Sequence, residues 1–395
     1  MRPPPTAVRR AVLDPLWPPV ALVVAALLLA VAAVGGLARP VTRRCLGHKR
    51  CLGQERPRPS AGRRPGPWRV PRLALLGALY VLLDALLLVR CAGLWLRHPV
   101  AAARDDERWQ EAHLRALRWI LATLRAAATT LVGFTILVEE PPAVRPRGDD
   151  PANPPDWRQL DGRPVLVLAR HAGPGDSFAL VELLLSRYGR RPRIVLKEDL
   201  RWDPGLDVVL GRLSACFLPA HSDADDDLAE RVGGLARGLR GDDAMLLFPE
   251  GGNWTPLRYQ RALRRLFFRA DFGVAADAAR NRHVLPPRPA GVLACLAARP
   301  DLDVVVVAHS GLDDLVSPVM LWQALPLAGR PMTVRWWYEP ASAVPSDPEE
   351  QYLWLREQWA IVDSWVETMF NRREEGKQER LSRADADGAQ PDYGS

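Results

Sequence analysis

The sequence predicts an α/β domain with a mostly parallel sheet flanked by helices, preceded by N-terminal membrane helices. From about residue 164 onward, short and continuously apolar runs of strand length alternate with helix-like segments. This pattern is typical of strands that are buried on both faces of a parallel sheet. Two long apolar runs precede this region. The 395 residues, 48% of them hydrophobic, leave room for one large domain and an attachment.

The individual strands and helices are predicted from these runs. The strand candidates are apolar and short, and they are residues 165–169, 193–197, 216–219, 244–248, 303–308 and 333–339. The helix candidates lie between or after them, at about 177–188, 226–240, 257–270, 289–299 and 348–372. Asp347 is the expected N-cap of the last helix, with Pro348 at its first position. The polar tail, residues 373–395, is predicted to be disordered.

The two apolar runs near the N-terminus predict attachment to a membrane. Residues 20–38 carry no charge over about the length that crosses a bilayer, and they are long for a signal peptide, so an uncleaved anchor is the preferred interpretation. Residues 73–96 contain Asp84 and Arg90, and either charge is costly at the centre of a bilayer. We expect this second helix to lie in the interface, to re-enter or to pack against the first; a buried helix of the folded domain is the alternative.

The chain is therefore divided into three parts. Residues 1–100 are the predicted anchoring region, with a basic linker at 39–72 that favours the cytoplasmic side of a cell membrane. Residues 101–372 form the predicted folded domain, which would face the cytoplasm, and the tail follows.

Cysteine usage and net charge narrow the classes of function. Five cysteines are scattered and imply no disulfide framework. Cys45, His48 and Cys51 lack a fourth ligand with zinc-like spacing, so no metal site is predicted. The net charge of +7 comes with an excess of arginine beside high Ala, Pro and Gly content. That bias fits GC-rich coding better than a binding signature, and no nucleic-acid partner is expected.

Three histidines stand five residues before an aspartate, a spacing that can form a catalytic pair. The pairs are His171–Asp176, His221–Asp226 and His309–Asp314. In a parallel sheet, chemistry gathers at the carboxyl ends of the strands. His171 comes two residues after an apolar strand, and the sequence AGPG then predicts a tight loop. Spacing favours the first pair without excluding the other two.

A second motif decides between them. The stretch FPEGGNWTPLR, residues 248–258, follows another buried strand, and its glycines would let the backbone approach a ligand. A His-x4-Asp box followed by a Phe-Pro-Glu-Gly box resembles the glycerolipid acyltransferase family, whose type members are the 1-acylglycerol-3-phosphate acyltransferases. The order selects His171 and Asp176, because His221 lies too close to Glu250 and His309 follows it. The stretch around Lys197 and the segment VLPPRPAG also resemble the family, and the resemblance covers roughly residues 130 to 370.

The resemblance implies an enzyme of phospholipid biosynthesis. It would move a fatty acyl chain from acyl-CoA or acyl carrier protein, without a cofactor, to a hydroxyl of a lysophospholipid-like acceptor. His171 suits the role of general base near neutral pH, and Asp176 would orient it and stabilise the imidazolium. The expected substrate-binding residues, with Glu250 and Gly251 lining the acceptor site by resemblance, are Glu250, Gly251, Gly252, Asn253, Lys197 and Arg258.

The chain departs from the family pattern at two positions. Ala220 and Asn253 stand where the family has arginines that hold the phosphate of the acceptor, although Arg258, Arg261 or Lys197 could substitute. Because Arg–phosphate pairs are strong and geometrically specific, lysophosphatidate is expected to be a poorer acceptor than a lysolipid with a larger or less charged head group. The alternatives are a phosphatidate-forming enzyme, an acyltransferase for a non-phosphate lipid, and a non-catalytic lipid-binding membrane protein. The intact His–Asp pair argues against the last.

Overall fold

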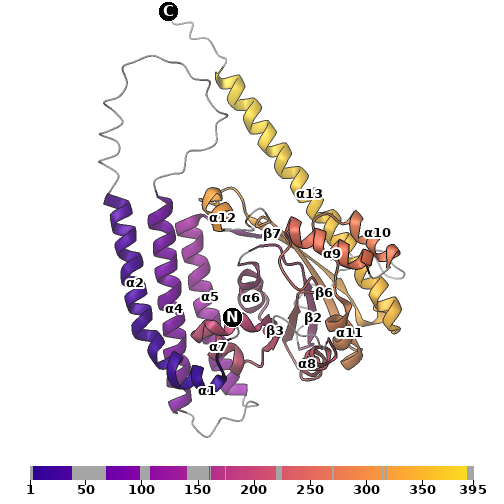
Figure 1. Cartoon of the computed structure of the whole chain (residues 1–395), viewed down its shortest axis with the longest axis horizontal. Helices are drawn as coiled ribbons and strands as arrows, with labels where there is room; N and C mark the ends of the chain where they lie inside the picture. Colours follow the sequence, from indigo (N-terminus) through magenta and orange to yellow (C-terminus); the bar gives the residue numbers. More distant parts are fainter. Residues whose placement is uncertain are drawn as a thin grey trace, which may run out of the picture.

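The computed structural model describes residues 3–37, 68–97, 107–139, 160, 162–173, 175–218, 225–268, 271–313, 315 and 318–388. Figure 1 shows a bundle of long N-terminal helices beside an α/β domain, with a long C-terminal helix on the other side. Most of the basic linker predicted at 39–72 lies outside the described residues. Its last residues, from Arg69 onward, are helical.

The N-terminal helices form a close pair. The chain runs through α1 (Thr6–Val8), a π-helical turn (Arg9–Leu13) and α2 (Asp14–Leu37), and α4 (Arg69–Arg97) lies beside α2. Several small side chains of the two helices are buried, and small residues of this kind let helices pack closely. They are Ala21, Ala25 and Ala32 of α2 and Ala74, Ala78 and Ala85 of α4. The segments Thr6–Gly35 and Arg69–Arg97 are each long and apolar enough to cross a membrane, judged by length and composition alone.

Asp84 and Arg90, the two charges within the apolar run 73–96, have separate partners. The carboxylate of Asp84 is buried, and it accepts hydrogen bonds from the indole N–H of Trp17 (2.7 Å) and the backbone N–H of Gly205 (3.2 Å). Gly205 belongs to α7 (Pro204–Arg212) of the α/β domain. Arg90 is exposed and lies over the ring of Trp119, 4.8 Å from its centre. Asp84 therefore joins both apolar helices to the domain.

The α/β prediction is confirmed by a single seven-stranded sheet with the order β1-β7-β6-β2-β5-β3-β4. All neighbouring strands are parallel except β6 and β7. The strands are β1 (Ile136–Val138), β2 (Val165–Ala169), β3 (Arg191–Lys197), β4 (Cys216–Leu218), β5 (Asp243–Leu247), β6 (Asp303–Ser310) and β7 (Met332–Glu339). The sequence did not predict β1, which is too short to give a periodic signal.

Helices cover both faces of the sheet. The faces alternate along each strand, so Val165, Val167 and Ala169 of β2 face one layer while Leu166 and Leu168 face the other. The first layer contains α5 (Glu107–Val132), α6 (Asp176–Ser186) and α7, with α4 packed behind them. The second contains α8 (Asp225–Arg237), α11 (Pro289–Ala298) and α13 (Pro348–Gly388). The short helices α10 (Phe272–Arg280) and α12 (Pro318–Ala324), like α7, were not predicted, whereas α9 (Pro256–Phe268) was.

The C-terminal helix begins as predicted and ends later than predicted. Asp347 accepts hydrogen bonds from the backbone N–H groups of Glu349 (2.9 Å) and Glu350 (3.1 Å), as an N-cap should. The helix then continues to Gly388, through residues that were expected to be disordered. Low apolar content predicted disorder there, but the segment is rich in Arg, Glu, Lys and Gln, which favour helix, and it extends a helix already nucleated on the core. Residues 389–395 lie outside the described part.

Candidate active site

His171 and Asp176 are brought together at the carboxyl end of β2. His171 follows this strand by two residues, and Asp176 is the first residue of α6. The imidazole Nδ1 lies 2.9 Å from Oδ2 of the carboxylate. Gly175 precedes the helix with φ +88°, a left-handed conformation that favours glycine and closes the short loop. The ring of Phe248 packs against the imidazole, with 4.7 Å between ring centres.

The environment of Asp176 keeps this side chain ionised. Burial alone would raise its pKa, but hydrogen bonds from His171 and His309 hold the pKa well below the usual range. The backbone N–H groups of Ala172 (2.9 Å), Gly173 (3.2 Å) and Ser177 (2.6 Å) also donate to it. A carboxylate on Nδ1 leaves the other ring nitrogen, Nε2, available. No described residue is hydrogen-bonded to Nε2, and the imidazole side chain is 17% exposed.

The other two candidate histidines, His221 and His309, differ in what the structure shows of them. His221 lies outside the described residues, as does Asp314, the partner proposed for His309. His309 itself is fully buried at the carboxyl end of β6, and its Nε2 lies 2.9 Å from the backbone oxygen of Arg170 and 3.4 Å from Oδ2 of Asp176. The structure therefore places it beside the first pair rather than in a site of its own.

Glu250, which the resemblance places at the acceptor site, is a buried side chain engaged by the backbone. It is 2% exposed, and its two oxygens accept hydrogen bonds from the backbone N–H groups of His171 (3.1 Å) and Leu285 (3.0 Å). Burial raises the pKa of Glu250 to about 8, partly offset by the charge of Arg170 and by these N–H donors. The side chain thus joins the loop that carries His171 to the segment that carries Leu285. Its neighbour Gly251 is exposed, whereas Gly252 is buried.

Three cations gather around the two glycines of the FPEGG segment. A Cβ atom added to Gly252 would lie 3.1 Å from the Arg258 guanidinium and 3.5 Å from Nζ of Lys197, and one added to Gly251 would lie 3.1 Å from the Arg288 guanidinium. Partial burial and the charges of Arg258 and Arg288 lower the pKa of Lys197, with Asp199 acting in the opposite direction. Within the described part of the chain, no carboxylate lies at ion-pair distance from any of the three.

The cation cluster, Lys197, Arg258 and Arg288, includes one residue that sequence reasoning did not select. Arg288 belongs to VLPPRPAG, which was quoted only as a resemblance to an apolar segment. Asn253 contributes its backbone oxygen, which accepts from Arg258 (3.1 Å), and its side chain is not involved in any described hydrogen bond. Ala220 lies outside the described residues.

Comparison with known proteins now identifies the domain. Residues 145–288 match the Acyltransferase family model, and this range contains His171, Asp176, Glu250 and the whole cation cluster. The match covers less than half of the chain, and it shows that this range is similar to acyltransferases. An uncharacterized acyltransferase of Schizosaccharomyces pombe is 24% identical over 189 residues, which are 45% of this chain and 51% of that protein. The chain thus matches about half the length of this curated relative.

A solved structure with some likeness to this chain is the crystal structure of the 1-acyl-sn-glycerophosphate (LPA) acyltransferase of Thermotoga maritima. Its sequence identity to this chain is 16%, and its TM-score is 0.45. The likeness covers 76% of this chain and 97% of that one.

An apolar cavity of about 450 Å³ lies next to the His–Asp pair of the acyltransferase domain. Gly175 and Ala179 contribute to its wall on the side of α6, and Leu312 and Leu315 follow β6. The remaining wall comes from α4, α5, α6, α12, β1 and the segments beside them, with the residues Leu73, Leu76, Gly77, Tyr80, Leu121, Leu124, Arg125, Ala128, Val132, Phe134, Ile136, Phe178, Glu182, Leu321 and Leu327. The cavity has the chemistry to hold a hydrocarbon chain.

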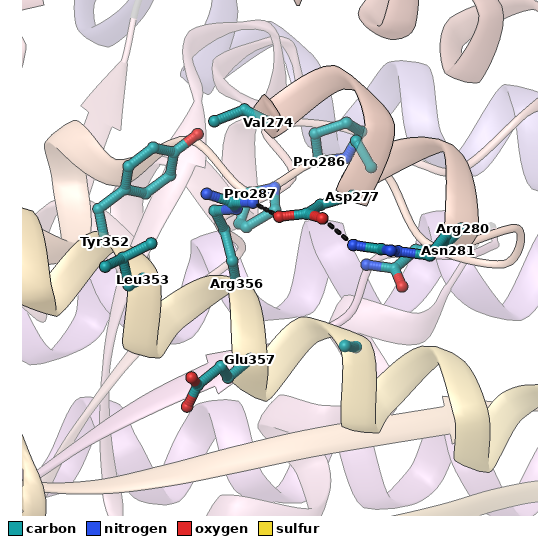
Figure 2. Close-up of a pocket in the computed structure, with 12 residues that line it drawn as sticks. Val274, Asp277, Arg280, Asn281, Pro286, Pro287, Tyr352, Leu353, Arg356 and Glu357 are labelled. Atoms are coloured by element: carbon teal, nitrogen blue, oxygen red, sulfur yellow. Dashed lines mark hydrogen bonds and ion pairs between the residues drawn. The ribbon is translucent and has the colours of Figure 1, made fainter. Parts of the chain in front are cut away.

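A second cavity, of about 310 Å³, lies between α10 and α13 (Figure 2). None of the predicted site residues lines it. Figure 2 shows Asp277 between Arg280 and Arg356, and it is ion-paired with both. Because Asp277 is engaged by both arginines and none of the residues selected for catalysis lines this cavity, the reaction is not assigned to it.

Proposed function

We propose that this acyltransferase moves a fatty acyl chain from a thioester donor to a hydroxyl of an anionic lysophospholipid at a membrane. One observation carries the proposal. The His171–Asp176 pair, whose Nε2 has no hydrogen-bond partner among the described residues, lies close to both a cation cluster without described counter-ions and an apolar cavity. A base, an anion site and a hydrocarbon site are the three elements that acyl transfer to a phospholipid requires.

The chemistry needs no covalent enzyme intermediate, because a thioester is already activated. Nε2 of His171 takes the proton of the acceptor hydroxyl as its oxygen attacks the thioester carbonyl. The C–S bond then breaks, an ester C–O bond has formed, and the thiolate takes the proton from the imidazolium to leave as a free thiol. Asp176 holds Nδ1 and stabilises the imidazolium, the orienting role that a buried carboxylate has in hydrolytic triads. Acyl-CoA and acyl carrier protein both supply such a thioester, and no cofactor is involved.

The N-terminal helices support action at a membrane. Large apolar side chains of α2 face outward, among them Leu22 (63% exposed), Val23 (61%) and Leu27 (63%), which is favourable in lipid and costly in water. Asp84 of α4 is instead engaged by α7 of the domain. We propose that α2 and α4 anchor the protein to a cell membrane without α4 crossing it, and that the domain faces the cytoplasm, where the donors are.

The cation cluster changes the expectation about the acceptor. The sequence argued against lysophosphatidate because two arginines of the family pattern are replaced at positions 220 and 253. Lys197, Arg258 and Arg288 provide three other donors for a phosphate, two of them guanidinium groups that can bind it in bidentate geometry. We therefore propose a phosphate-bearing lysophospholipid as acceptor.

The test is a transfer assay with full-length protein in vesicles and labelled acyl-CoA or acyl carrier protein. Lysolipid acceptors with a phosphate monoester, with a phosphodiester and without phosphate are compared at equal concentration. Transfer to the phosphate-bearing acceptors should exceed transfer to the phosphate-free one. Single Arg258→Ala and Arg288→Ala variants should raise KM for the phosphate-bearing acceptors about tenfold, since a charge-assisted hydrogen bond contributes about 1.5–3 kcal/mol.

Arg261→Ala is the matched control, because this arginine is exposed on the same helix as Arg258 but is not part of the cluster. Equal transfer rates to the phosphate-free and phosphate-bearing acceptors, with Arg258→Ala and Arg288→Ala as active as Arg261→Ala, would contradict the phosphate proposal. That result would favour an acyltransferase for a non-phosphate lipid. No transfer to any acceptor would favour the non-catalytic, lipid-binding alternative.

The apolar cavity predicts the selectivity for acyl length. Ala128 of α5 lines the cavity, so Ala128→Phe should fill part of it and displace two or three methylenes of a long chain. This removes about 2 kcal/mol of apolar burial, or roughly a 30-fold loss in kcat/KM for the longest donors, while shorter donors are little affected. Ala126→Phe, on the exposed face of the same helix, is the control. An equal loss for all chain lengths would show that the chain binds elsewhere.

A further inference from the structure

His309 is a buried histidine that contacts the carboxylate of the catalytic pair from a different strand. It stands at the carboxyl end of β6, next to β2, where Ala169 pairs with Val307. Its Nε2 lies 2.9 Å from the oxygen of Arg170 and 3.4 Å from Oδ2 of Asp176, and the side chain is fully buried. It is not part of the His-x4-Asp or Phe-Pro-Glu-Gly boxes, and it lies beyond the residues that the family model matches.

The hydrogen bonds of His309 define which ring nitrogen carries the proton. A backbone oxygen only accepts, so Nε2 must donate to the oxygen of Arg170. Nδ1 is buried and has no hydrogen-bond partner among the described residues. The arrangement presents an N–H group at Nε2 to the oxygen of Arg170 and, at 3.4 Å, to Oδ2 of Asp176.

The charged groups around His309 are consistent with this role. Asp176 faces it from the first turn of α6, and Arg170, in the loop after β2, is ion-paired with Asp313 of the loop after β6. Arg373 of α13 reaches Asp313 as well, at 3.8 Å. Arg170 and Arg373 therefore supply positive charge to this cluster, and both lie at ion-pair distance from Asp313.

We propose that His309 is a positioning residue, whose Nε2–H fixes the Asp176 carboxylate toward His171 and limits how strongly that carboxylate holds the imidazolium. The inference rests on the proposed function. The other donors to Asp176 come from residues 171–177, the loop that carries Asp176 itself. Among the described contacts His309 is the one that ties this carboxylate to another strand of the sheet. Partners of this kind hold a reacting group in its productive orientation, and a displacement of about 1 Å can cost on the order of 100-fold in rate.

Two substitutions separate the donor from the packing. His309→Leu fills a similar volume without an N–H and should lower kcat about tenfold with little change in KM for either substrate. With one donor fewer, Asp176 holds the imidazolium of His171 more strongly, so the acid limb of the kcat/KM profile should move upward by about half a pH unit. His309→Gln places an amide N–H near the original Nε2 and should restore both the rate and the profile.

A readout without substrate keeps this test separate from the proposed function. Diethyl pyrocarbonate modifies neutral imidazole, and the side chain of His171 is 17% exposed while that of His309 is buried. The pH dependence of modification at His171, followed by mass spectrometry, should shift upward in His309→Leu and not in His309→Gln. If wild type transfers no acyl group to any acceptor, the proposed function fails and this shift still tests His309.

Three results would overturn the proposal. A folded His309→Leu variant with wild-type kcat and profile would show that the contact is incidental. Equal losses in His309→Leu and His309→Gln, with no shift in either profile, would show a packing role alone. Activity in His171→Ala together with its loss in His309→Leu would make His309 the base. If His309→Leu does not fold, His309→Asn, whose amide ends one methylene short of Asp176, takes its place with the same expectations.

Discussion

Replacing His171 by alanine is expected to lower kcat by about 100-fold or more while leaving the protein folded. Nε2 of His171 has no hydrogen-bond partner among the described residues, the imidazole side chain is 17% exposed, and Asp176 holds the opposite nitrogen at 2.9 Å. Without the imidazole, the acceptor hydroxyl has no base beside it, because Glu250 is buried and engaged by two backbone groups. The measurement is kcat with saturating acceptor and donor, together with the thermal unfolding midpoint.

The control is His283→Ala, a histidine whose backbone oxygen serves the site while its ring stacks on Phe370, away from the pair. This variant should keep most of the activity, as should His221→Ala. Asp176→Asn should resemble His171→Ala in severity, since an amide can present an N–H to Nδ1 and favour the wrong tautomer. A His171→Ala variant with wild-type kcat would contradict the choice of this pair.

The sequence predicted contacts between residues that are close in the chain, and it missed contacts that form only when strands pair in the sheet. His171 and Asp176 are five residues apart, and their spacing together with the order of the His-x4-Asp and Phe-Pro-Glu-Gly boxes predicted this contact. His309 reaches the same carboxylate only because β6 pairs with β2, and strand order is not encoded in any short pattern. The same spacing that selected the first pair also suggested Asp314 as the partner of His309, whereas the structure places it against Asp176.

The fold shows the same division. The apolar runs located six of the seven strands, but they did not reveal that β7 is antiparallel to β6, since strand direction depends on the connection and not on composition. Arg288 was overlooked for a similar reason. Its own segment is rich in proline and apolar residues, so the sequence did not indicate a charged site there. Arg288 becomes part of a cation cluster because the fold brings the end of β3 and the segment after β5 next to it.

Glu250→Ala is expected to cause the largest loss of stability among these variants. The carboxylate is buried and accepts from the backbone N–H groups of His171 and Leu285, so its removal leaves two buried donors without a partner. Each such donor costs about 1–3 kcal/mol, and the free energy of unfolding should fall by about 2–5 kcal/mol. Activity should fall as well, because the backbone of His171 loses its tie to the FPEGG loop. Glu349→Ala, at an exposed position in the first turn of α13, should change neither quantity.

Glu250→Gln distinguishes this structural role from direct contact with the acceptor. The amide oxygen can accept from one of the two N–H groups, but its NH₂ group faces the other, so a smaller loss of stability is expected than in Glu250→Ala.

Burial raises the pKa of Glu250 from 4.5 to about 8, which means that the folded protein favours the protonated acid. Wild-type stability gained from this group is therefore complete below about pH 4.5 and is lost as the pH rises toward about 8. The unfolding midpoint of wild type should fall over this window, and the fall should be smaller in Glu250→Gln. A Glu250→Gln variant with wild-type stability and pH dependence, but with a raised KM for the acceptor alone, would instead place the carboxylate in contact with the acceptor.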